Sequence, residues 1–445
     1  MDRVYLVSLG CPKNRVDSEV MVGKLQQGPW ELIEEPEGAD VIVVNTCSFI
    51  QPATEESIET VLEMAKFKEA GSCKKLIVTG CMVQRYGSSL EGELPEVDHF
   101  LGTGEYHRID DILKAREGEA PRSYVDTPMY IHDEMAPRVN SWARHSAYLK
   151  ISEGCNHRCS FCIIPQLRGK LRSRSIESLC VEALALASKG VREINLVSQD
   201  STAYGRDLYG KPRLAALLTA LAKVEGIDWI RIHYAYPIGL PDDLLEVIAN
   251  EPKVLSYLDM PLQHASGPML KAMKRGVTRA GQERILERVR AAIPDITIRT
   301  TFIVGFPGET EEDFDVLMDF VRRERFSRVG VFTYCQEDGT PAAELGEQVP
   351  EEIRQDRQAR LMALQEAISL EKNEALVGQV CPIIVDGVYE ETDLLLKGRL
   401  ATQAPDVDGH VLLTSAPKGV KAGDILPFRI TRATAHDLVA EFVEA

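Results

Sequence analysis

The chain has 445 residues and a formal net charge of −17, with 44% hydrophobic and 27% charged residues. This balance is typical of a globular protein and excludes a disordered or fibrous chain, and the length suffices for about three domains. Apolar runs such as Val41–Val44 are far shorter than the roughly 20 residues of a membrane span. The start MDRVYLVSLGC lacks the apolar core of a signal peptide. We therefore expect a cytoplasmic protein without a membrane partner, and the acidic balance counts against a large nucleic-acid-binding surface.

Residues 1–120 alternate strand and helix patterns, and three apolar runs of strand length each end at a cysteine. The runs are Val4–Gly10 before Cys11, Val41–Thr46 before Cys47 and Lys75–Gly80 before Cys81, with helical patterns at Asp17–Gln27 and Thr54–Ala70. Continuous apolar strands separated by helices predict a doubly wound parallel sheet. The three cysteines are then expected at its carboxyl edge, where ligands bind in such sheets.

A linker is predicted over residues 121–144, and a second series of strands and helices follows over residues 145–375. Its predicted strands are Ala147–Ser152, Glu193–Ser198, Trp229–Tyr234, Val254–Asp259, Ile296–Val304 and Arg328–Tyr334. Amphipathic helices between them predict a partial or full (β/α) barrel, whose chemistry lies at the carboxyl ends of the strands. A long charged helix, Glu351–Ala375, closes this part. Residues 378–445 show short strands with Gly, Pro and Asp turns, which predict a small all-β barrel of the OB type.

Three cysteines with C-x3-C-x2-C spacing, Cys155, Cys159 and Cys162, directly follow the first predicted barrel strand. Three thiolates within eight residues can hold three irons of one iron–sulfur cluster and leave the fourth iron open. The alternative is a structural zinc site, which usually has four protein ligands, and only His157 is near enough in sequence to complete it.

The C-x3-C-x-aromatic-C pattern at the first strand of a βα barrel resembles the signature of the radical S-adenosylmethionine superfamily. The resemblance implies that the open iron binds the methionyl part of S-adenosylmethionine and that one electron cleaves the cofactor to a 5′-deoxyadenosyl radical. It also implies that Phe161 lies against the adenine of the cofactor.

Cys11, Cys47 and Cys81 could hold a second cluster, or they could be small buried residues at strand ends. Their flanks SLGCPKNRVDSE, NTCSFI and TGCMVQR resemble the amino-terminal domain of the methylthiotransferase family of radical S-adenosylmethionine enzymes. The resemblance covers the whole chain. It implies two [4Fe–4S] clusters, a central radical barrel and a TRAM-like barrel at the end of the chain.

Two branches of that family differ in substrate. One methylthiolates adenosine in tRNA, and the other methylthiolates an aspartate of the small-subunit ribosomal protein S-twelve. Pro12-Lys13-Asn14 stands where the tRNA branch shows Gln-Met-Asn, and the segment Gln403–Gly409 resembles the ribosomal-protein branch. Residues 379–445 hold ten acidic and six basic residues, so their net charge of −4 suits a basic protein partner better than tRNA. The ribosomal-protein branch is therefore favoured, and the tRNA enzyme is the alternative.

The resemblance also implies an external electron donor, a sulfur donor and a substrate that is free or in the ribosome, with no direct specific nucleic-acid binding. A protein of another functional class, a non-catalytic iron–sulfur electron carrier, is a further alternative, but such carriers usually supply four ligands to each cluster.

Other residues have a less specific signal. Gln199, Arg299 and Gly305 are candidates for cofactor binding, with an internal ion pair as the alternative for Arg299 and a simple turn as the alternative for Gly305. The candidates for substrate binding are Gln263, His264, Asp406 and Asp408. For His264 the alternative is a structural histidine with satisfied hydrogen bonds.

Overall fold

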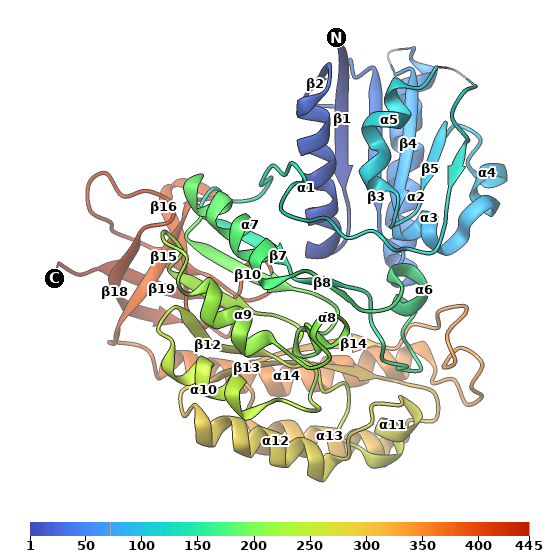
Figure 1. The fold of residues 1–445 in the computed structure, drawn as a ribbon. Helices are drawn as coiled ribbons and strands as arrows, with labels where there is room; N and C mark the ends of the chain where they lie inside the picture. The colour runs from blue at the N-terminus through green and yellow to red at the C-terminus, as the bar shows by residue number, and fades with distance from the viewer. Residues whose placement is uncertain (72, 117, 445) are drawn as a thin grey trace.

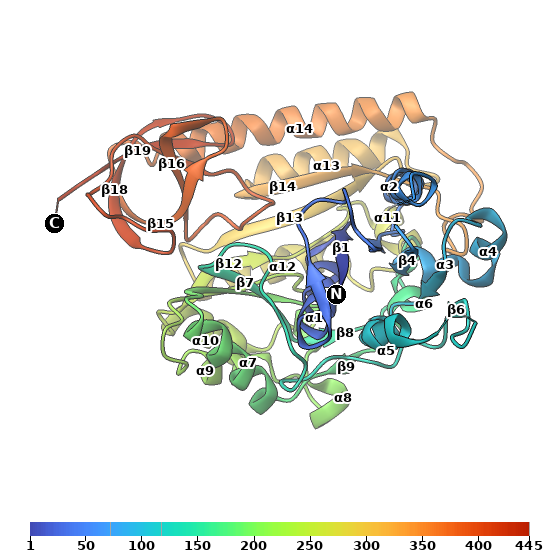
Figure 2. The same ribbon diagram turned by 90° about the horizontal axis from the view of Figure 1, so that it is seen from above.

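The computed structural model describes residues 1–71, 73–116 and 118–444, without the side chain of residue 393. Figure 1 shows three parts: a blue N-terminal sheet with its helices, a green-to-yellow central sheet with its helices, and a red closed barrel. In the view of Figure 2, helix α14 (Glu351–Glu374) runs along the central part towards the closed barrel. The class is α/β with an all-β barrel at the end of the chain, and this confirms the predicted fold class.

Six parallel strands form the N-terminal sheet in the order β2-β1-β3-β4-β5-β6. They are β1 (Asp2–Ser8), β2 (Trp30–Leu32), β3 (Val41–Thr46), β4 (Lys75–Gly80), β5 (His99–Leu101) and β6 (Ser123–Tyr124). The helices are α1 (Pro12–Gln27), α2 (Gln51–Glu69), α3 (Cys81–Tyr86), η1 (Gly87–Ser89), α4 (Leu90–Glu93), η2 (Tyr106–Arg108) and α5 (Ile109–Lys114). Ile42 and Val44 pack on one face of the sheet and Val41 and Val43 on the other, so both faces are covered. The chain changes direction across the sheet between β1 and β3, where doubly wound sheets bind ligands.

Two helices of this part begin earlier than the sequence pattern predicts. Helix α1 begins at Pro12 rather than Asp17, and α2 begins at Gln51 rather than Thr54. Each carries a proline in its first two positions, where the missing N–H is not needed and the fixed φ favours the helix. The acidic residues that suggested later starts lie within the helices. Cys11 is therefore the N-cap of α1.

The central sheet has the strand order β14-β13-β12-β11-β10-β7, with parallel pairing throughout. Its strands are β7 (Ser146–Lys150), β10 (Glu193–Val197), β11 (Trp229–Ile232), β12 (Val254–Asp259), β13 (Thr297–Val304) and β14 (Arg328–Thr333). Each predicted strand is confirmed to within two residues. Because β7 and β14 are edges that do not pair, the sheet is a partial barrel. The strands β8 (Ser152–Glu153) and β9 (Arg172–Ser173) form a separate two-stranded sheet.

Helices cover the outer face of the central sheet. They are α7 (Ile176–Ser188), α9 (Leu214–Leu221), α10 (Asp242–Asn250), α12 (Arg279–Ala292) and α13 (Glu311–Glu324). The shorter helices α6 (Ile164–Arg168), η3 (Ser201–Ala203), α8 (Arg206–Tyr209) and α11 (Gly267–Ala272) lie in the segments that connect the strands. Alternate strand residues such as Ile194 and Leu196 belong to the large apolar core. The residues between them, such as Glu193 and Asn195, are polar and buried. Since side chains alternate across a strand, the inner face of the partial barrel is polar.

A closed five-stranded barrel ends the chain, in the order β15-β16-β17-β19-β18. Its strands are β15 (Val380–Tyr389), β16 (Thr392–Leu400), β17 (Val411–Leu413), β18 (Ile425–Ala433) and β19 (Leu438–Phe442). Ile384 of this barrel packs with Trp229 and Tyr257 of the central strands. Arg399 donates to the buried carboxylate of Glu193 at 2.6 Å. The closed barrel is therefore fixed to the inner face of the central sheet.

The strand β6 lies within the predicted linker and pairs with β5; two residues are too few to give a recognisable strand pattern. Among the described residues, none of the helices combines the length and hydrophobicity of a membrane span.

Candidate active site

The Cys155–Cys162 loop follows strand β8 at the carboxyl end of β7. Gly154 has a φ of +81°, and a Cβ there would lie 2.1 Å from the carbonyl oxygen of Lys170, so only glycine allows this close approach. The backbone N–H of Cys155 donates to the carbonyl of Gly169 at 3.0 Å. The loop that carries the three cysteines is thus held against the segment that follows it.

The three thiols of this loop lie close enough to affect one another's ionisation. Burial raises the pKa of Cys155 to about 11 and that of Cys162 to about 12, and repulsion from neighbouring thiolates, including Cys159, adds to both shifts. Thiols that resist ionisation together are deprotonated when a metal centre supplies the opposing positive charge. The donor set therefore fits an iron–sulfur cluster.

Side chains distant in sequence surround this loop. Arg275 donates to Sγ of Cys159 at 3.3 Å, and its guanidinium lies 4.3 Å from the ring centroid of Tyr236. The ring of His157 stacks on the ring of the same tyrosine at a centroid distance of 3.7 Å, and its Nε2 lies 2.6 Å from a carboxylate oxygen of Asp200. Sequence reasoning missed Arg275, because it stands in a loop without a motif, 116 residues from its cysteine.

Cys11, Cys47 and Cys81 follow the adjacent strands β1, β3 and β4. A Cβ built on Gly10 would lie 3.0 Å from Sγ of Cys47, so the backbone next to Cys11 touches the second cysteine. Burial raises the pKa of Cys81 to about 12, with repulsion from Cys47 and Cys11 opposed by Arg168. The three strand ends thus bring these thiols together, as the sheet topology predicts.

The two cysteine sets adjoin. Cys81 packs against Ile163, the residue after Cys162, and Nη2 of Arg168 donates to Sγ of Cys81 at 3.5 Å. No three described His, Cys, Asp or Glu side chains are grouped to hold a single metal ion. Each cysteine of a cluster binds a different iron, so such ligands need not meet at one point.

Four buried charged side chains form a network of ion pairs between the two strand edges. Arg168 donates to Asp17 of α1 at 2.6 Å, and Lys150 donates to Glu153 at 2.8 Å and also contacts Asp17. Burial alone would raise the pKa of Glu153, but the charges of Lys150 and Arg168 outweigh it and lower the pKa. Two cations and two anions neutralise one another, so neither edge buries an unpaired charge.

A second ion pair joins the same two parts. Arg85 of α3 donates to Glu337, in the segment after β14, at 2.7 Å, and both side chains are more than nine-tenths buried. Glu337 also accepts from the backbone N–H of Gln51 at 2.6 Å. The N-terminal sheet is therefore held over the central strands on two sides.

The predicted cofactor-binding residues have different surroundings. Phe161 packs, half-buried, against Met269, Met273, Phe306 and Tyr334. Nε2 of Gln199 donates to Glu153 at 2.5 Å, while its buried Oε1 has no described partner. Phe161 is part of the Cys155–Cys162 loop, and Gln199 contacts Glu153, two residues before Cys155.

Gly305 and Arg299 lie against other side chains of the protein. Gly305 has a φ of +71°, and a Cβ there would lie 2.0 Å from Cγ of Arg354, so its lack of a side chain makes room for this arginine. Arg299 donates to Asp259 at 3.1 Å and lies 3.6 Å from Asp408. It forms the internal ion pair and stands three residues into β13, deep in the partial barrel.

His264 is fully buried, its Nε2 lies 3.1 Å from Glu309, and its Nδ1 accepts from the backbone N–H of Ser266 at 2.9 Å. These contacts are those of a structural histidine, which is the alternative for this residue. Gln263 has a φ of +72° and a buried Oε1 without a described partner.

Asp406 and Asp408 lie in the segment between β16 and β17, where the closed barrel contacts the other parts of the chain. Asp408 is fully paired, because it accepts from the hydroxyl of Tyr257 and the N–H of Ala404, both at 2.8 Å. Asp406 forms an ion pair with Arg15 of α1 at 3.2 Å. Asp408 is thus a buried structural residue rather than a substrate ligand, whereas Asp406 stays half-exposed.

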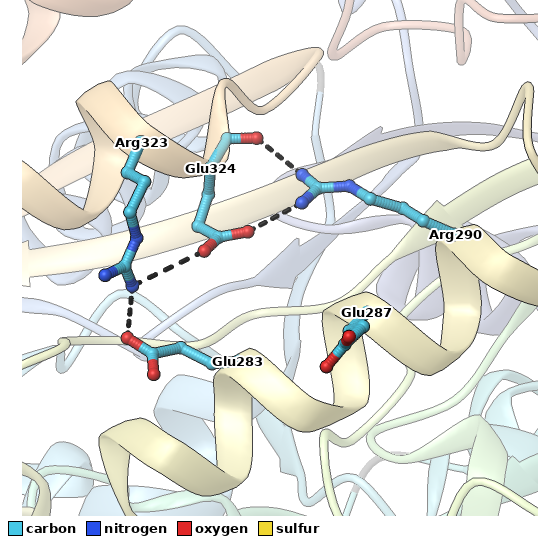
Figure 3. A pocket seen from close by; sticks show the side chains of 5 residues that line it. All are labelled: Glu283, Glu287, Arg290, Arg323 and Glu324. Carbon is cyan, nitrogen blue, oxygen red and sulfur yellow. Dashed lines mark hydrogen bonds and ion pairs between the residues drawn. The ribbon is translucent and has the colours of Figure 1, made fainter.

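A pocket of about 380 Å³ lies elsewhere, between the outer helices α12 and α13 (Figure 3). Arg290 donates to Glu324 at 2.6 Å, and Arg323 contacts Glu283. Because both arginines are already paired with Glu283 or Glu324, this pocket is lined by a surface ion-pair network.

Comparisons with known proteins agree with this architecture. Residues 3–102 match the Uncharacterized protein family UPF0004, residues 149–321 the Radical SAM superfamily and residues 377–443 the TRAM domain. The radical S-adenosylmethionine methyltransferase TsrM from Kitasatospora setae, solved with cobalamin and a [4Fe–4S] cluster, shares the fold. Its TM-score is 0.57 at 13% identity, with 77% of each chain covered. The fold and the C-x3-C-x2-C loop together define a radical S-adenosylmethionine enzyme.

The comparison with full-length relatives identifies the family more specifically. The chain is 53% identical over 442 residues to the ribosomal protein uS12 methylthiotransferase RimO of Anaeromyxobacter sp. (strain Fw109-5), with 99% of this chain and 93% of that protein covered. It is 49% identical to the protein of the same name from Geobacter sulfurreducens, with 99% of each covered. The chain belongs to the RimO family of methylthiotransferases.

Proposed function

We propose that this protein adds a methylthio group to the β-carbon of an aspartate in ribosomal protein uS12, with two [4Fe–4S] clusters and S-adenosylmethionine as cofactors. The observation that supports this most is the meeting of two three-cysteine sets at facing strand edges, joined by Arg168. The named relatives act on uS12, and the alternative of a tRNA enzyme is not favoured.

In this proposal Cys155, Cys159 and Cys162 hold one cluster, and Cys11, Cys47 and Cys81 hold the other. Bound there, the cofactors supply the electron transfer, the radical cleavage of S-adenosylmethionine and the sulfur transfer of the reaction. Phe161 and Gln199 are proposed to line the S-adenosylmethionine site, and Gln263 to line the substrate site.

The residues of the chain hold and shield these groups. Arg275 and Arg168 donate hydrogen bonds to one cysteine sulfur of each set, and such donors stabilise negative charge on sulfur. The buried ion pairs of Asp17 and Glu337 keep the two parts docked. A radical reaction requires an enclosed site, because a carbon radical abstracts hydrogen from C–H bonds that lie near it.

The closed barrel is proposed to meet the substrate. Its net charge of −4 complements a basic ribosomal protein. An external electron donor, a sulfur donor, a cytoplasmic location, and the absence of membrane attachment and specific nucleic-acid binding belong to the same proposal.

The test is the reaction itself. Anaerobically reduced protein is incubated with S-adenosylmethionine and uS12, and tandem mass spectrometry seeks a methylthio group on an aspartate. Cys159→Ala should abolish 5′-deoxyadenosine formation, while Cys47→Ala should keep part of that cleavage and lose thiolation. A methylthio group on a tRNA adenosine instead of uS12 would support the alternative, and a fully active Cys47→Ala variant would refute the second cluster.

A further inference from the structure

Lys13 is a buried cation without a carboxylate partner. It stands in the first turn of α1, two residues after Cys11, and only 9% of its surface is exposed. Its described contacts are the ring of Tyr234, 3.5 Å from Nζ to the centroid, and the carbonyl oxygen of Ser198 at 3.4 Å. No described Asp or Glu forms an ion pair with it, whereas the fully buried Lys150 contacts two carboxylates.

This difference matters because burying a charge is costly unless a partner compensates it. A ring face and one long hydrogen bond compensate an ammonium only in part, since neither partner carries a formal charge. An ammonium with free donor capacity is therefore available for an anion that arrives from outside.

Lys13 lies where the N-terminal sheet meets the mouth of the partial barrel. Ser198 directly follows β10, and the next residue, Gln199, contacts Glu153 beside the Cys155 loop. Tyr234 follows β11 and has a φ of +58°, a conformation that is strained for tyrosine. Backbone strain of this kind gathers at functional sites. The ammonium thus lies two residues from Cys11 and contacts the strand end that leads to Gln199, whose side chain reaches Glu153 before the second cysteine set.

An aromatic wall leads from Lys13 to the outside. Tyr234 packs in one small cluster with Trp142 and Tyr148, and Trp142 stacks on Tyr148 at a centroid distance of 4.9 Å. The hydroxyl of Tyr148 donates to Asp406 at 3.2 Å, and Asp406 pairs with the partly exposed Arg15. All three parts of the chain contribute to this wall, and its outer end reaches the acidic closed barrel.

We propose that Lys13 binds the carboxylate of the aspartate that is modified, and so selects an acidic side chain for reaction at its β-carbon. This inference rests on the proposed function. The paired charge would hold the side-chain carboxylate at the junction of the cysteine sets, which places the adjacent β-carbon at the site of the reaction. A neutral side chain of the same shape would leave the ammonium unpaired.

The test measures binding rather than turnover. Two peptides are used, one with the target aspartate of uS12 and one with asparagine in its place, and their affinities for the cluster-loaded protein are measured by fluorescence anisotropy. Wild type should bind the aspartate peptide about tenfold or more tightly than the asparagine peptide, because loss of one partner of a buried charge pair costs at least that much.

Lys13→Met removes the charge at similar length and should bind both peptides equally, at the level of the asparagine peptide in wild type. Lys13→Arg should keep a preference for aspartate. Lys24→Met, on the same helix about 16 Å away, should match wild type. Iron content, circular dichroism and S-adenosylmethionine cleavage without peptide verify that each variant is folded and loaded.

Two outcomes would overturn the proposal. The first is a wild-type protein that binds both peptides equally, and the second is a Lys13→Met variant that keeps the preference for the aspartate peptide. If that variant also loses affinity for S-adenosylmethionine, the lysine is assigned to the cofactor instead. If wild type neither binds nor modifies the aspartate peptide, the proposed function fails as well.

Discussion

Arg168 of the central part donates a hydrogen bond to Sγ of Cys81 in the N-terminal sheet, at 3.5 Å and across 87 residues of sequence. The same guanidinium also reaches Asp17 and Asn14 of α1, at 2.6 and 3.0 Å. One side chain from the barrel therefore touches a cysteine of the other part and the helix beside it. This arginine and its neighbours therefore join the two strand edges that carry the cysteine sets.

Iron content is the first quantity to measure. Wild-type protein prepared without oxygen should hold about eight irons per chain, and a variant with Cys155, Cys159 and Cys162 all replaced by alanine should hold about four, because each set binds one four-iron cluster. Reduced-state EPR should then show the signal of the remaining cluster alone. Four irons in wild type and none in the variant would mean that the N-terminal cysteines are structural.

Arg168→Met should destabilise the protein by about 3–5 kcal/mol, because it leaves buried carboxylates with too few cations. The midpoint of urea unfolding checks this, and the control is Arg144→Met, which replaces an exposed arginine without a described ion pair.

Arg168→Met also removes the hydrogen-bond donor to Cys81, and this loss should shift the midpoint potential of the N-terminal cluster. Arg168→Lys should restore the potential in part. An unchanged potential would contradict a role of this hydrogen bond.

The ion pair of Arg85 and Glu337 should behave as a coupled unit. Arg85→Met leaves Glu337 buried and unpaired and should cost about 3–5 kcal/mol, whereas the double variant with Glu337→Met should cost less than the sum of the single changes. A double-mutant cycle on unfolding midpoints measures this coupling. Additive effects would show that the pair does not hold the N-terminal sheet in place.

Stability should fall in acid because of Glu193. Burial alone would raise its pKa, but Arg399 and Arg231 outweigh burial and hold the pKa well below the usual value. A lowered folded-state pKa gives stability that is complete above the unfolded-state value of about 4.3 and is lost as the pH falls through the folded-state value.

Thermal unfolding of Glu193→Gln should accordingly depend less on pH than that of wild type between about pH 5 and pH 3. Glu246→Gln, which changes an exposed carboxylate on α10, should keep the wild-type slope. Equal slopes in wild type and Glu193→Gln would contradict the assignment of acid sensitivity to this residue.

Much of the architecture could be predicted from local patterns. Apolar runs that end at Cys11, Cys47 and Cys81 are strands by their length, and parallel strands bring such ends to one edge. The C-x3-C-x2-C loop is likewise local, so its place after β7 needed no tertiary information. The starts of α1 and α2 were placed too late because Pro12 and Pro52 are stronger start signals than acidic residues.

The tertiary structure decided which polar residues serve the site. His264 and Asp408 resembled binding residues in sequence, yet both are buried and satisfied by partners that only folding supplies. Arg168 and Arg275 carried no signal, since their cysteine partners lie 87 and 116 residues away. Hydrogen bonds depend on distance in space, and sequence spacing reports that distance only within one helix or strand. The sequence by itself therefore determined the cysteine sets and the strands that precede them, while the docking of three parts determined the charges around them.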